Sequence, residues 1–321
     1  MKLSLHLWRI YRHPFVYILF LCIFILLIYF QLLAFEDKKA HVDLLIIIPS
    51  SPHERALRDA IRNSWLKYGY NDVLGNHFKH YFVIGTNKLD DGVLEYLETE
   101  MNLHEDLLLL RNVSDSYNTL SQKILQAFVS IGDANRFSEF SFVLKTDSDS
   151  FVNVPGLLKR LRENDVADIQ YAYLGFFIGN GPVFRKGKWA EFSWDSCVHY
   201  TPYAAGGGYI LSRKSVQYIA KNAGILRIFN NEDVTVGFWF SAVNVKRIHD
   251  RRFDTEYKSR GCSNKYLVTH PHSMENIQLM TELATKSQGR QICLKESVLM
   301  YSYEYRWNGN PLNCCNRTLK F

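Results

Sequence analysis

Two carboxylates, Asp147 and Asp149, have the first spacing in this chain that suggests chemistry. They follow the run "FVLKT" (residues 142–146) and are separated only by Ser148. Two acids at positions i and i+2 of a turn can both reach one hard cation, such as Mn²⁺ or Mg²⁺, which neutralises a diphosphate leaving group. The pair therefore predicts a metal site for a nucleotide diphosphate. By itself, the tripeptide also fits a solvated acidic turn.

Two other kinds of acidic site fit this turn less well. An EF-hand loop is excluded, because Phe151 and Val152 would occupy its fifth position, which needs an oxygen ligand, and its sixth, which needs glycine. A covalent aspartyl nucleophile would directly follow the apolar run. Here Lys145 and Thr146 intervene, so a nucleophile stays only as a minor alternative.

Two later motifs could complete such a site. Three consecutive glycines, Gly206 to Gly208, stand in "YTPYAAGGGYILS" and would permit close backbone approach to a ligand, or simply a tight turn. Glu232 and Asp233 directly precede an apolar, helix-like run. Acids there can interact favourably with the helix dipole, but one that faces a bound donor could act as a general base.

The elements that must position these residues alternate between strands and helices. Apolar runs predict buried strands at "VDLLIIIP", "HYFVIG", "DLLLL" and "FSFVLKT". Helical spacing is found in "ERALRDAIRNSWLK" and in "DSYNTLSQKILQAFVSI", for which Asp115 or Ser116 is the expected cap. The pattern predicts an α/β domain with a mainly parallel sheet, and such sheets bind ligands at the carboxyl ends of their strands. The acidic pair follows such an end.

The N-terminal residues predict a membrane anchor. Residues 15–35 contain no charged residue, and basic residues precede them. This stretch is long enough for a helix that spans a membrane. We therefore expect a cytoplasmic tail (1–14), a signal-anchor (15–35), a short stem (36–41) and a lumenal domain (42–321). A cleaved signal peptide is less consistent with the length of the span. The net charge of +6 without a long basic run argues against nucleic acid.

Cysteines and sequons agree with a lumenal location. Five cysteines, Cys197, Cys262, Cys293, Cys314 and Cys315, lie beyond the anchor and could form two disulfides with one thiol left over. The sequence does not give their pairing. Asn112 in "NVS" and Asn316 in "NRT" are N-glycosylation acceptors by pattern.

Four motifs in order carry a family resemblance. The segments "RDAIRNSW", "FVLKTDSDSFVN", "YAAGGGYILS" and "EDVTVG" resemble the β-1,3-glycosyltransferases of glycosyltransferase family 31. The C-terminal segments "HDRRFDTEYKSRGCSNKYLVTH" and "SYEYRWNGNPLNCCNR" narrow the resemblance to members that build the proteoglycan linkage region. The resemblance implies a GT-A fold, which is a Rossmann-like α/β domain, and Mn²⁺ or another divalent cation.

The resemblance also assigns roles to single residues. Asp147 and Asp149 match the outer acids of the family's D-D-D metal motif, with Ser148 replacing the middle one, and His249 is the candidate third ligand, with His270 as the other candidate. Asp233 matches the catalytic base, and Glu232 is the second choice. The expected donor-binding residues are Arg58, Arg62, Lys145, Gly206, Gly207 and Gly208, although Arg62 could only brace the fold.

The implied activity is inverting transfer of galactose from UDP-galactose to the galactosyl-xylosyl-serine stub of proteoglycan core proteins, at the Golgi membrane and beside other linkage-region transferases. Aromatic residues between Tyr171 and Trp194 could stack on the acceptor, although core packing explains most of that segment. Two alternatives stay open. One is a family-31 galactosyl- or N-acetylglucosaminyltransferase with another acceptor, and the other is a non-catalytic lumenal binding protein.

Overall fold

A computed structural model describes residues 18, 20–26, 42–72, 77–133, 139–196, 198–309 and 314–319. The predicted anchor lies mostly outside this part of the chain, apart from residue 18 and a helical stretch at 20–26. Among the described residues, no helix combines the length and apolar character needed to cross a membrane. The described residues from Val42 onward belong to one compact unit.

A seven-stranded mixed sheet forms the centre of this unit, in the order β3-β2-β1-β4-β7-β6-β8. The bounds of its strands, in chain order, are β1 Val42–Pro49, β2 Phe78–Gly85, β3 Leu107–Leu110, β4 Phe140–Thr146, β6 Ala172–Ile178, β7 Tyr203–Ser212 and β8 Lys246–His249. Strand β7 runs antiparallel to both β4 and β6, whereas the other neighbours pair in parallel. The expected α/β class and mainly parallel sheet are confirmed.

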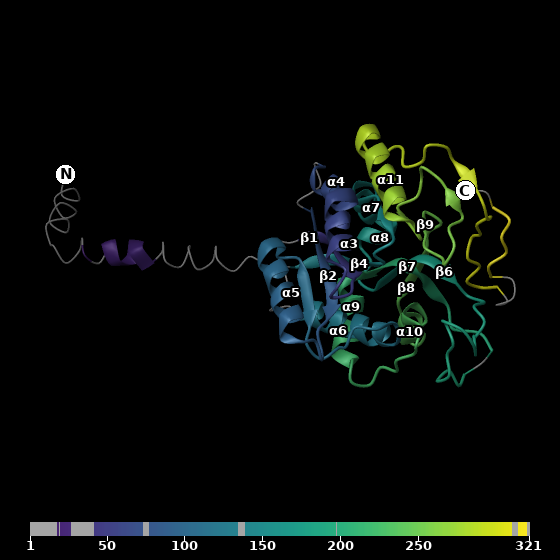
Figure 1. Cartoon of the computed structure of the whole chain (residues 1–321), viewed down its shortest axis with the longest axis horizontal. Coiled ribbons are helices and arrows are strands. Elements are labelled where there is room, and N and C mark those ends of the chain that lie inside the picture. Colours follow the sequence, from purple (N-terminus) through teal and green to yellow (C-terminus); the bar gives the residue numbers. More distant parts are fainter. Residues whose placement is uncertain are drawn as a thin grey trace, which may run out of the picture. The chain divides into compact units, whose positions relative to one another are not determined.

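Helices cover both faces of the sheet (Figure 1). The face that contains Leu44, Ile46 and Ile48 of β1 packs against α3 (Arg55–Ile61), the π-helical turn Arg62–Leu66, α7 (Val154–Leu161) and α11 (Met274–Ser287). The other face contains Leu45 and Ile47 and packs against α6 (Leu120–Gly132), α9 (Arg213–Asn222) and α10 (Glu232–Trp239). This alternation explains the unbroken apolar run in β1, because both faces of the strand are buried.

Two small sheets complete the unit. Strand β5 (Phe151–Val152) directly follows the acidic turn and pairs with β11 (Val268–Thr269), which also pairs with β9 (Phe253–Asp254). Strands β10 (Gly261–Cys262) and β12 (Ser297–Val298) form the other small sheet. The remaining helices are α4 (Lys67–Tyr70), α5 (Asp91–His104), α8 (Asn164–Ala167) and the 3-10 turn Tyr117–Thr119.

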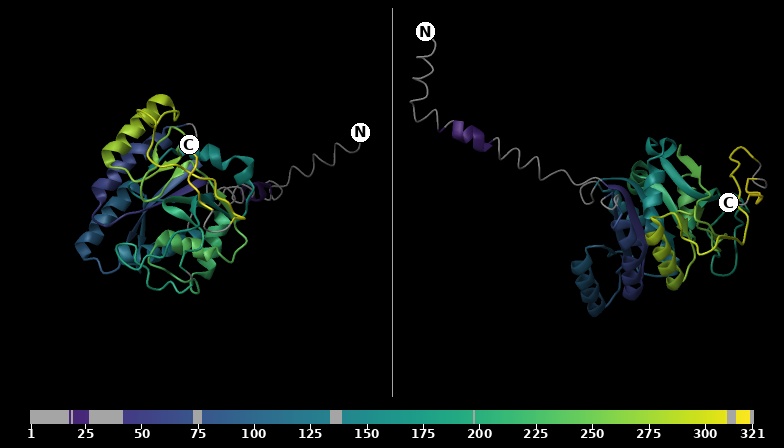
Figure 2. Two further views of the ribbon diagram at one scale, coloured as in Figure 1. Left: turned by 90° about the vertical axis from the view of Figure 1, so that its right-hand side faces the viewer. Right: turned by 90° about the horizontal axis from the view of Figure 1, so that it is seen from above.

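The chain after α11 returns past β6 and β8 (the yellow ribbon in Figures 1 and 2). There the Tyr303 hydroxyl donates to the backbone oxygen of Phe177, 2.8 Å away. One disulfide, Cys262–Cys293, joins β10 to the segment after α11. Cys197 lies outside the described residues, so a second disulfide stays a prediction.

One predicted helix start is wrong. Helix α6 begins at Leu120 after a 3-10 turn, and its N-cap residue is Thr119 rather than Asp115 or Ser116. The Asp115 carboxylate instead accepts hydrogen bonds from the Gly85 amide (3.1 Å) and the Lys123 ammonium (2.7 Å). Asp115 therefore links the end of β2 to α6, a contact between distant segments that local pattern does not reveal.

Candidate active site

The acidic turn follows β4, as predicted, and is tied to β7. Both the Thr146 and Ser150 hydroxyls donate to the backbone oxygen of Gly207, at 3.0 and 2.8 Å. Asp147 and Asp149 lie between these two anchors, and both side chains are partly exposed. The turn is therefore held at a fixed position beside the three glycines while its carboxylates stay accessible.

His270 lies against the two carboxylates. Its Nε2 atom is 3.3 Å from Asp149 Oδ1 and 3.7 Å from Asp147 Oδ2. The other ring nitrogen, Nδ1, is 2.9 Å from the backbone oxygen of Glu256 and must donate to it, because a carbonyl only accepts. Burial by itself opposes a charged ring, but Asp149 and Asp147 raise the pKa of His270. The imidazole is thus oriented with Nε2 toward the acids.

These three side chains fit a divalent cation. One ligand atom from each of Asp147, Asp149 and His270 lies within 4.8 Å of the others. Carboxylate oxygens suit Mn²⁺ and Mg²⁺, and an imidazole whose second nitrogen bonds a carbonyl is the usual form of a histidine ligand. The two acids were predicted as ligands, and His270 is the histidine that the fold places beside them.

His249 does not fit the third-ligand role for which it was the first candidate. Its Nδ1 atom accepts from the Phe177 amide (3.1 Å), and its Nε2 atom is 2.9 Å from the Tyr303 backbone oxygen. Both ring nitrogens are therefore engaged by backbone groups. Burial lowers the pKa of His249 to about 4, so the ring is neutral and packs between β6 and the C-terminal segment.

Each of the three glycines permits a different close approach to β7. A Cβ on Gly206 would lie 3.2 Å from Asp233 Oδ2, and one on Gly207 would lie 2.5 Å from Cγ of His270. A Cβ on Gly208 would lie 2.8 Å from Cγ1 of Val268 in β11. None of the three has a positive φ, so space rather than backbone conformation requires glycine here. The three glycines therefore allow the candidate base Asp233, His270 and strand β11 to pack closely against successive positions of β7.

Lys145 is a buried cation between two of the acids. Its Nζ atom lies 2.7 Å from Asp147 Oδ1, 3.0 Å from Glu232 Oε2 and 2.8 Å from the backbone oxygen of Gly206. Burial opposes its charge, yet Asp147 and Glu232 raise the pKa of Lys145 overall. Lys145 was predicted to bind the donor, but its ammonium is used to hold the acidic turn against α10.

Asp233 is the carboxylate at the start of α10 that is only partly buried. Its Oδ2 atom accepts from the Gly206 amide (3.1 Å), and Oδ1 accepts from the Val234 amide (2.8 Å). Burial, and then the negative charge of Glu232, raise the pKa of Asp233 to about 7. Glu232 is buried, and both its oxygens are bonded, by Lys145 and by the Tyr209 hydroxyl. Both acids have bonded oxygens, but Glu232 is buried whereas Asp233 is partly exposed, so the geometry favours Asp233 over Glu232 as the base.

Comparison with known proteins agrees with this site. The family model described as Galactosyltransferase matches residues 56–251. Mouse β-1,3-galactosyltransferase 6 is 40% identical over 283 residues, which cover 87% of this chain and 84% of that protein. The chain belongs to the galactosyltransferase family. The predicted family and the predicted class of enzyme are thereby confirmed.

More distant relatives share less of the chain. UDP-GalNAc:β-1,3-N-acetylgalactosaminyltransferase 2 of Xenopus laevis is 34% identical over 162 residues, which cover 50% of this galactosyltransferase and 32% of that protein. A probable β-1,3-galactosyltransferase 1 of Arabidopsis thaliana is 29% identical over 249 residues, covering 73% and 62% of the two chains. The mouse relative thus matches over much more of its length than the Xenopus protein does.

Two arginines predicted to bind the donor of this galactosyltransferase instead brace the fold. The fully buried Arg58 bonds Glu100 at 2.8 and 2.6 Å and the backbone oxygen of Ser51 at 2.6 Å. Arg62 bonds Glu100 and Asp106, both at 2.7 Å. Arg58 influences the site only by fixing the loop after β1, because its donors are directed to these internal partners.

Other residues of the site were not found from sequence. Tyr209 holds Glu232, and the Glu256 backbone oxygen orients His270. Tyr209 directly follows the glycine run, and this position in the sequence is the signal that places it near the site. Nothing in the sequence around Glu256 indicates its role, because that role uses a backbone atom. The two sequon residues, Asn112 and Asn316, are both exposed, which is what glycosylation would need.

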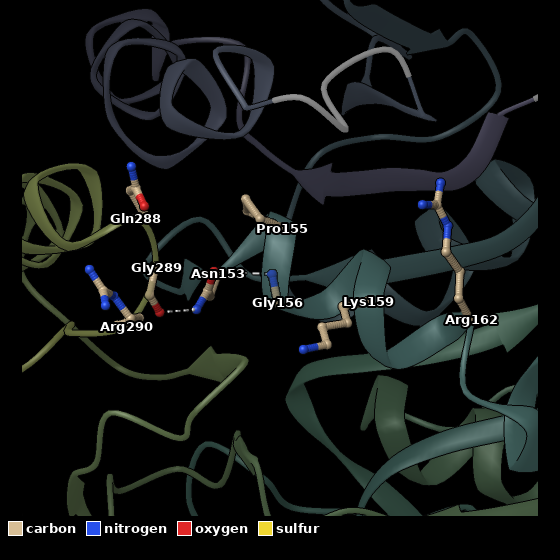
Figure 3. A pocket seen from close by; sticks show the side chains of 8 residues that line it. All are labelled: Asn153, Pro155, Gly156, Lys159, Arg162, Gln288, Gly289 and Arg290. Carbon is tan, nitrogen blue, oxygen red and sulfur yellow. Dashed lines mark hydrogen bonds between the residues drawn. The ribbon is translucent and has the colours of Figure 1, made fainter.

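A separate hollow of about 430 Å³ lies between α7 and the loop after α11 (Figure 3). Asn153 joins its two sides by donating to the backbone oxygen of Gly289 (3.3 Å). Lys159 and Arg290 are exposed at its rim, while Arg162 pairs with Asp43 at 2.6 Å. The side chains that line it include none of the acids described above, so this hollow is not the candidate active site.

Proposed function

We propose that this galactosyltransferase is an inverting β-1,3-galactosyltransferase that uses UDP-galactose. The proposal is carried by one arrangement. The Asp147, Asp149 and His270 cluster and the Asp233 carboxylate lie against successive glycines of β7. A single displacement at a sugar carbon needs a site for the cation that binds the diphosphate and a base held beside it, and here both lie against one strand.

In this mechanism Asp233 accepts the proton of the acceptor hydroxyl as its oxygen attacks C1 of galactose. The bond between C1 and the diphosphate oxygen breaks, and UDP leaves with the bonding electrons from the opposite face. A pKa of about 7 suits Asp233 to this task, because a base works best when its pKa lies near the working pH. No covalent enzyme intermediate is required.

Asp147, Asp149 and His270 would hold the divalent cation, whose chemistry is to offset the negative charge that develops on the leaving diphosphate. Lys145 keeps Asp147 in place and links it to Glu232. The Glu256 backbone oxygen fixes the orientation of His270. These contacts keep the ligands in position before substrates arrive, so less reorganisation is needed during the reaction.

For the acceptor we propose the galactosyl-xylosyl-serine stub of proteoglycans, with the enzyme anchored in the Golgi membrane as a type II protein. The support is the likeness of the C-terminal segments to linkage-region enzymes, the 40% identity to the mouse relative, and the uncharged stretch at residues 15–35. Core proteins carrying this stub would be its partners, together with other linkage-region transferases.

The test compares UDP release and product formation by the full chain with UDP-galactose, UDP-N-acetylgalactosamine and UDP-N-acetylglucosamine, with and without a β-galactosyl xyloside. We expect transfer of galactose to that acceptor with a β-1,3 linkage, read by NMR. Asp149→Ala should nearly abolish transfer in a protein that remains folded. Preference for another UDP-sugar, or near-native activity of Asp149→Ala, would contradict the proposal.

A further inference from the structure

Exposed aromatic rings gather on one part of the surface near the candidate active site. Within residues 171–194, Tyr173, Phe176 and Phe177 are fully buried. Phe184, Trp189 and Phe192 are instead 46%, 39% and 79% exposed. Large apolar side chains that stay in water side by side often mark a ligand-binding surface. The aromatic residues of this segment thus divide into a core set and a surface set.

Trp189 forms a pair with Tyr257, a residue from a distant loop. Their ring centroids lie 5.5 Å apart with an interplanar angle of 67°, and the centroid of the Phe184 ring lies 6.3 Å from that of Trp189. Tyr257 is 63% exposed, and the Lys258 ammonium lies 5.5 Å from its ring centre. The three rings form an apolar surface bordered by a cation, which we call the aromatic platform (Phe184, Trp189 and Tyr257).

The platform is connected to the site from both sides. The Asn231 side-chain amide donates to the backbone oxygen of Trp189 (3.1 Å), and Asn231 directly precedes Glu232 and Asp233. Tyr257 directly follows Glu256, whose backbone oxygen receives the His270 Nδ1 proton at 2.9 Å. One ring therefore belongs to a loop that contacts the start of α10, and the other to the loop that orients the histidine.

The loop that carries Trp189 is also fixed in place. Glu191 is 1% exposed, and its carboxylate accepts from the Asn230 amide (2.6 Å) and from the Ser193 amide (2.9 Å). A second bond runs from the Asn230 side chain to the backbone oxygen of Ala190 (3.0 Å). Trp189 is consequently presented by a rigid loop, so binding a ligand on its ring costs little ordering entropy.

We propose that the aromatic platform binds the acceptor, with Trp189 and Tyr257 stacking against the apolar C–H face of a sugar ring. This inference rests on the proposed function, since it names how the acceptor is held beside Asp233. A sugar suits the platform because it has an apolar face for the rings and hydroxyl groups for the polar surroundings. Tyr and Trp provide large and rigid contact surfaces at low entropic cost.

The experiment measures Trp189→Ala and Tyr257→Ala in the full chain, with Trp189→Phe as the conservative variant. Truncating Trp189 leaves its backbone oxygen, so the bond to Asn231 survives. Phe192→Ala is the matched control, because Phe192 is exposed on the same loop and takes part in none of the ring pairs among the described residues. Initial rates are recorded against the β-galactosyl xyloside and against UDP-galactose, together with UDP release without acceptor.

We expect each alanine variant to raise the KM for the acceptor about tenfold or more, the effect usual for loss of a buried aromatic contact. The KM for UDP-galactose and the acceptor-independent UDP release should change less than about twofold. Trp189→Phe should recover most of the acceptor affinity, and Phe192→Ala should match the wild type. Saturation-transfer NMR should show contact between the disaccharide and the wild-type protein, and a weaker one with Trp189→Ala.

Three contradicting outcomes are distinguishable. A wild-type chain that transfers galactose normally, with both alanine variants unchanged in acceptor KM, would refute the platform alone. A wild-type chain that neither transfers galactose nor binds the disaccharide would refute the proposed function. If Trp189→Ala alters the oligomeric state in gel filtration while the KM for the acceptor stays the same, the platform is a protein contact and the inference is wrong.

Discussion

Gly207→Ala tests how the glycine run positions the metal-binding residues of this galactosyltransferase. The added Cβ would lie 2.5 Å from Cγ and 2.7 Å from Nδ1 of His270, closer than real contacts allow. The ring cannot retreat freely, since Nδ1 donates to the Glu256 backbone oxygen at 2.9 Å. Overpacking of this kind costs about 1–3 kcal/mol. It must be relieved by moving the imidazole relative to Asp149 or by shifting β7.

We expect Gly207→Ala to weaken Mn²⁺ binding by about 10- to 100-fold, the loss typical when the support of a metal ligand is disturbed. Binding is measured directly by electron paramagnetic resonance of free Mn²⁺, and as the Mn²⁺ concentration that half-saturates UDP release. At saturating Mn²⁺ the variant should recover a large part of its turnover, because Asp233 is not touched. Thermal unfolding should occur a few degrees lower, about 2–4 °C for each kcal/mol lost.

Gly208→Ala is the matched control, because its Cβ would meet Cγ1 of Val268 at 2.8 Å rather than the histidine. It should lower thermal stability to a similar extent and leave Mn²⁺ affinity near the wild-type value. The reasoning is refuted if Gly207→Ala binds Mn²⁺ like the wild type. It is also refuted if Gly208→Ala loses as much Mn²⁺ affinity, since the effect would then be a general distortion of β7.

Three further outcomes follow from the described contacts. Asp233→Asn should lower turnover by about 10²–10⁴-fold and leave the affinity for UDP-galactose unchanged. Steady-state rates measure the turnover, and calorimetric titration measures the affinity. Normal turnover would show that Asp233 is not the base. Because only the deprotonated carboxylate accepts a proton, turnover should fall about tenfold per pH unit below the pKa of Asp233 and level off above it. That pKa is about 7 without the cation, and a bound cation lowers it; the midpoint of the profile should therefore fall as Mn²⁺ is raised, and a midpoint that Mn²⁺ does not move would argue against this. Arg58→Ala should reduce the free energy of unfolding by about 3 kcal/mol. This is the lower end for a broken buried ion pair, because Arg62 still bonds Glu100. Unchanged unfolding in denaturant would show that Arg58 does not brace the fold.

The acidic turn was predictable because its cause is local. A buried apolar strand followed by two acids at i and i+2 can hold a cation, although the tripeptide by itself also fits a solvated acidic turn. The carboxyl ends of parallel strands also meet at one edge of a sheet. The acids Glu232 and Asp233 were also visible locally, at the start of an apolar helix, but the choice of Asp233 as the base came from the family resemblance. The resemblance to a family then joined these separate signals in one site.

The histidine was ambiguous because its position depends on pairing between distant strands. His270 follows β11, and β11 pairs with β5, the strand that begins two residues after Asp149. A hydrogen bond from the His272 amide to the backbone oxygen of Asp149 (2.8 Å) joins the same two segments. His249 is the last residue of β8, which pairs with β6. Its two ring nitrogens bond the backbone amide of Phe177 and the backbone oxygen of Tyr303. No pattern within either segment distinguishes these outcomes.

The two arginines were misjudged for a similar reason. Their donor-binding role was implied by the family resemblance, which left open that Arg62 only braces the fold. Their anionic partners are Glu100 in α5 and Asp106 before β3, about forty residues along the chain. Helix α5 was not predicted from the sequence, so no local pattern pointed to the acids that satisfy both guanidinium groups.

The charge balance of the site explains why its parts belong together. Four carboxylates, those of Asp147, Asp149, Glu232 and Asp233, stand near only two cationic side chains, Lys145 and His270, among the described residues of the cluster. Burial, and then this excess of negative charge, raise the pKa of Asp233 to about 7. A divalent cation held by Asp147, Asp149 and His270 would offset much of the excess and favour the deprotonated form of Asp233. Cation binding and deprotonation of Asp233 are then linked by electrostatics. A variant that binds the cation more weakly should shift the pH dependence of turnover, and a change at Asp233 should shift the pH dependence of cation binding.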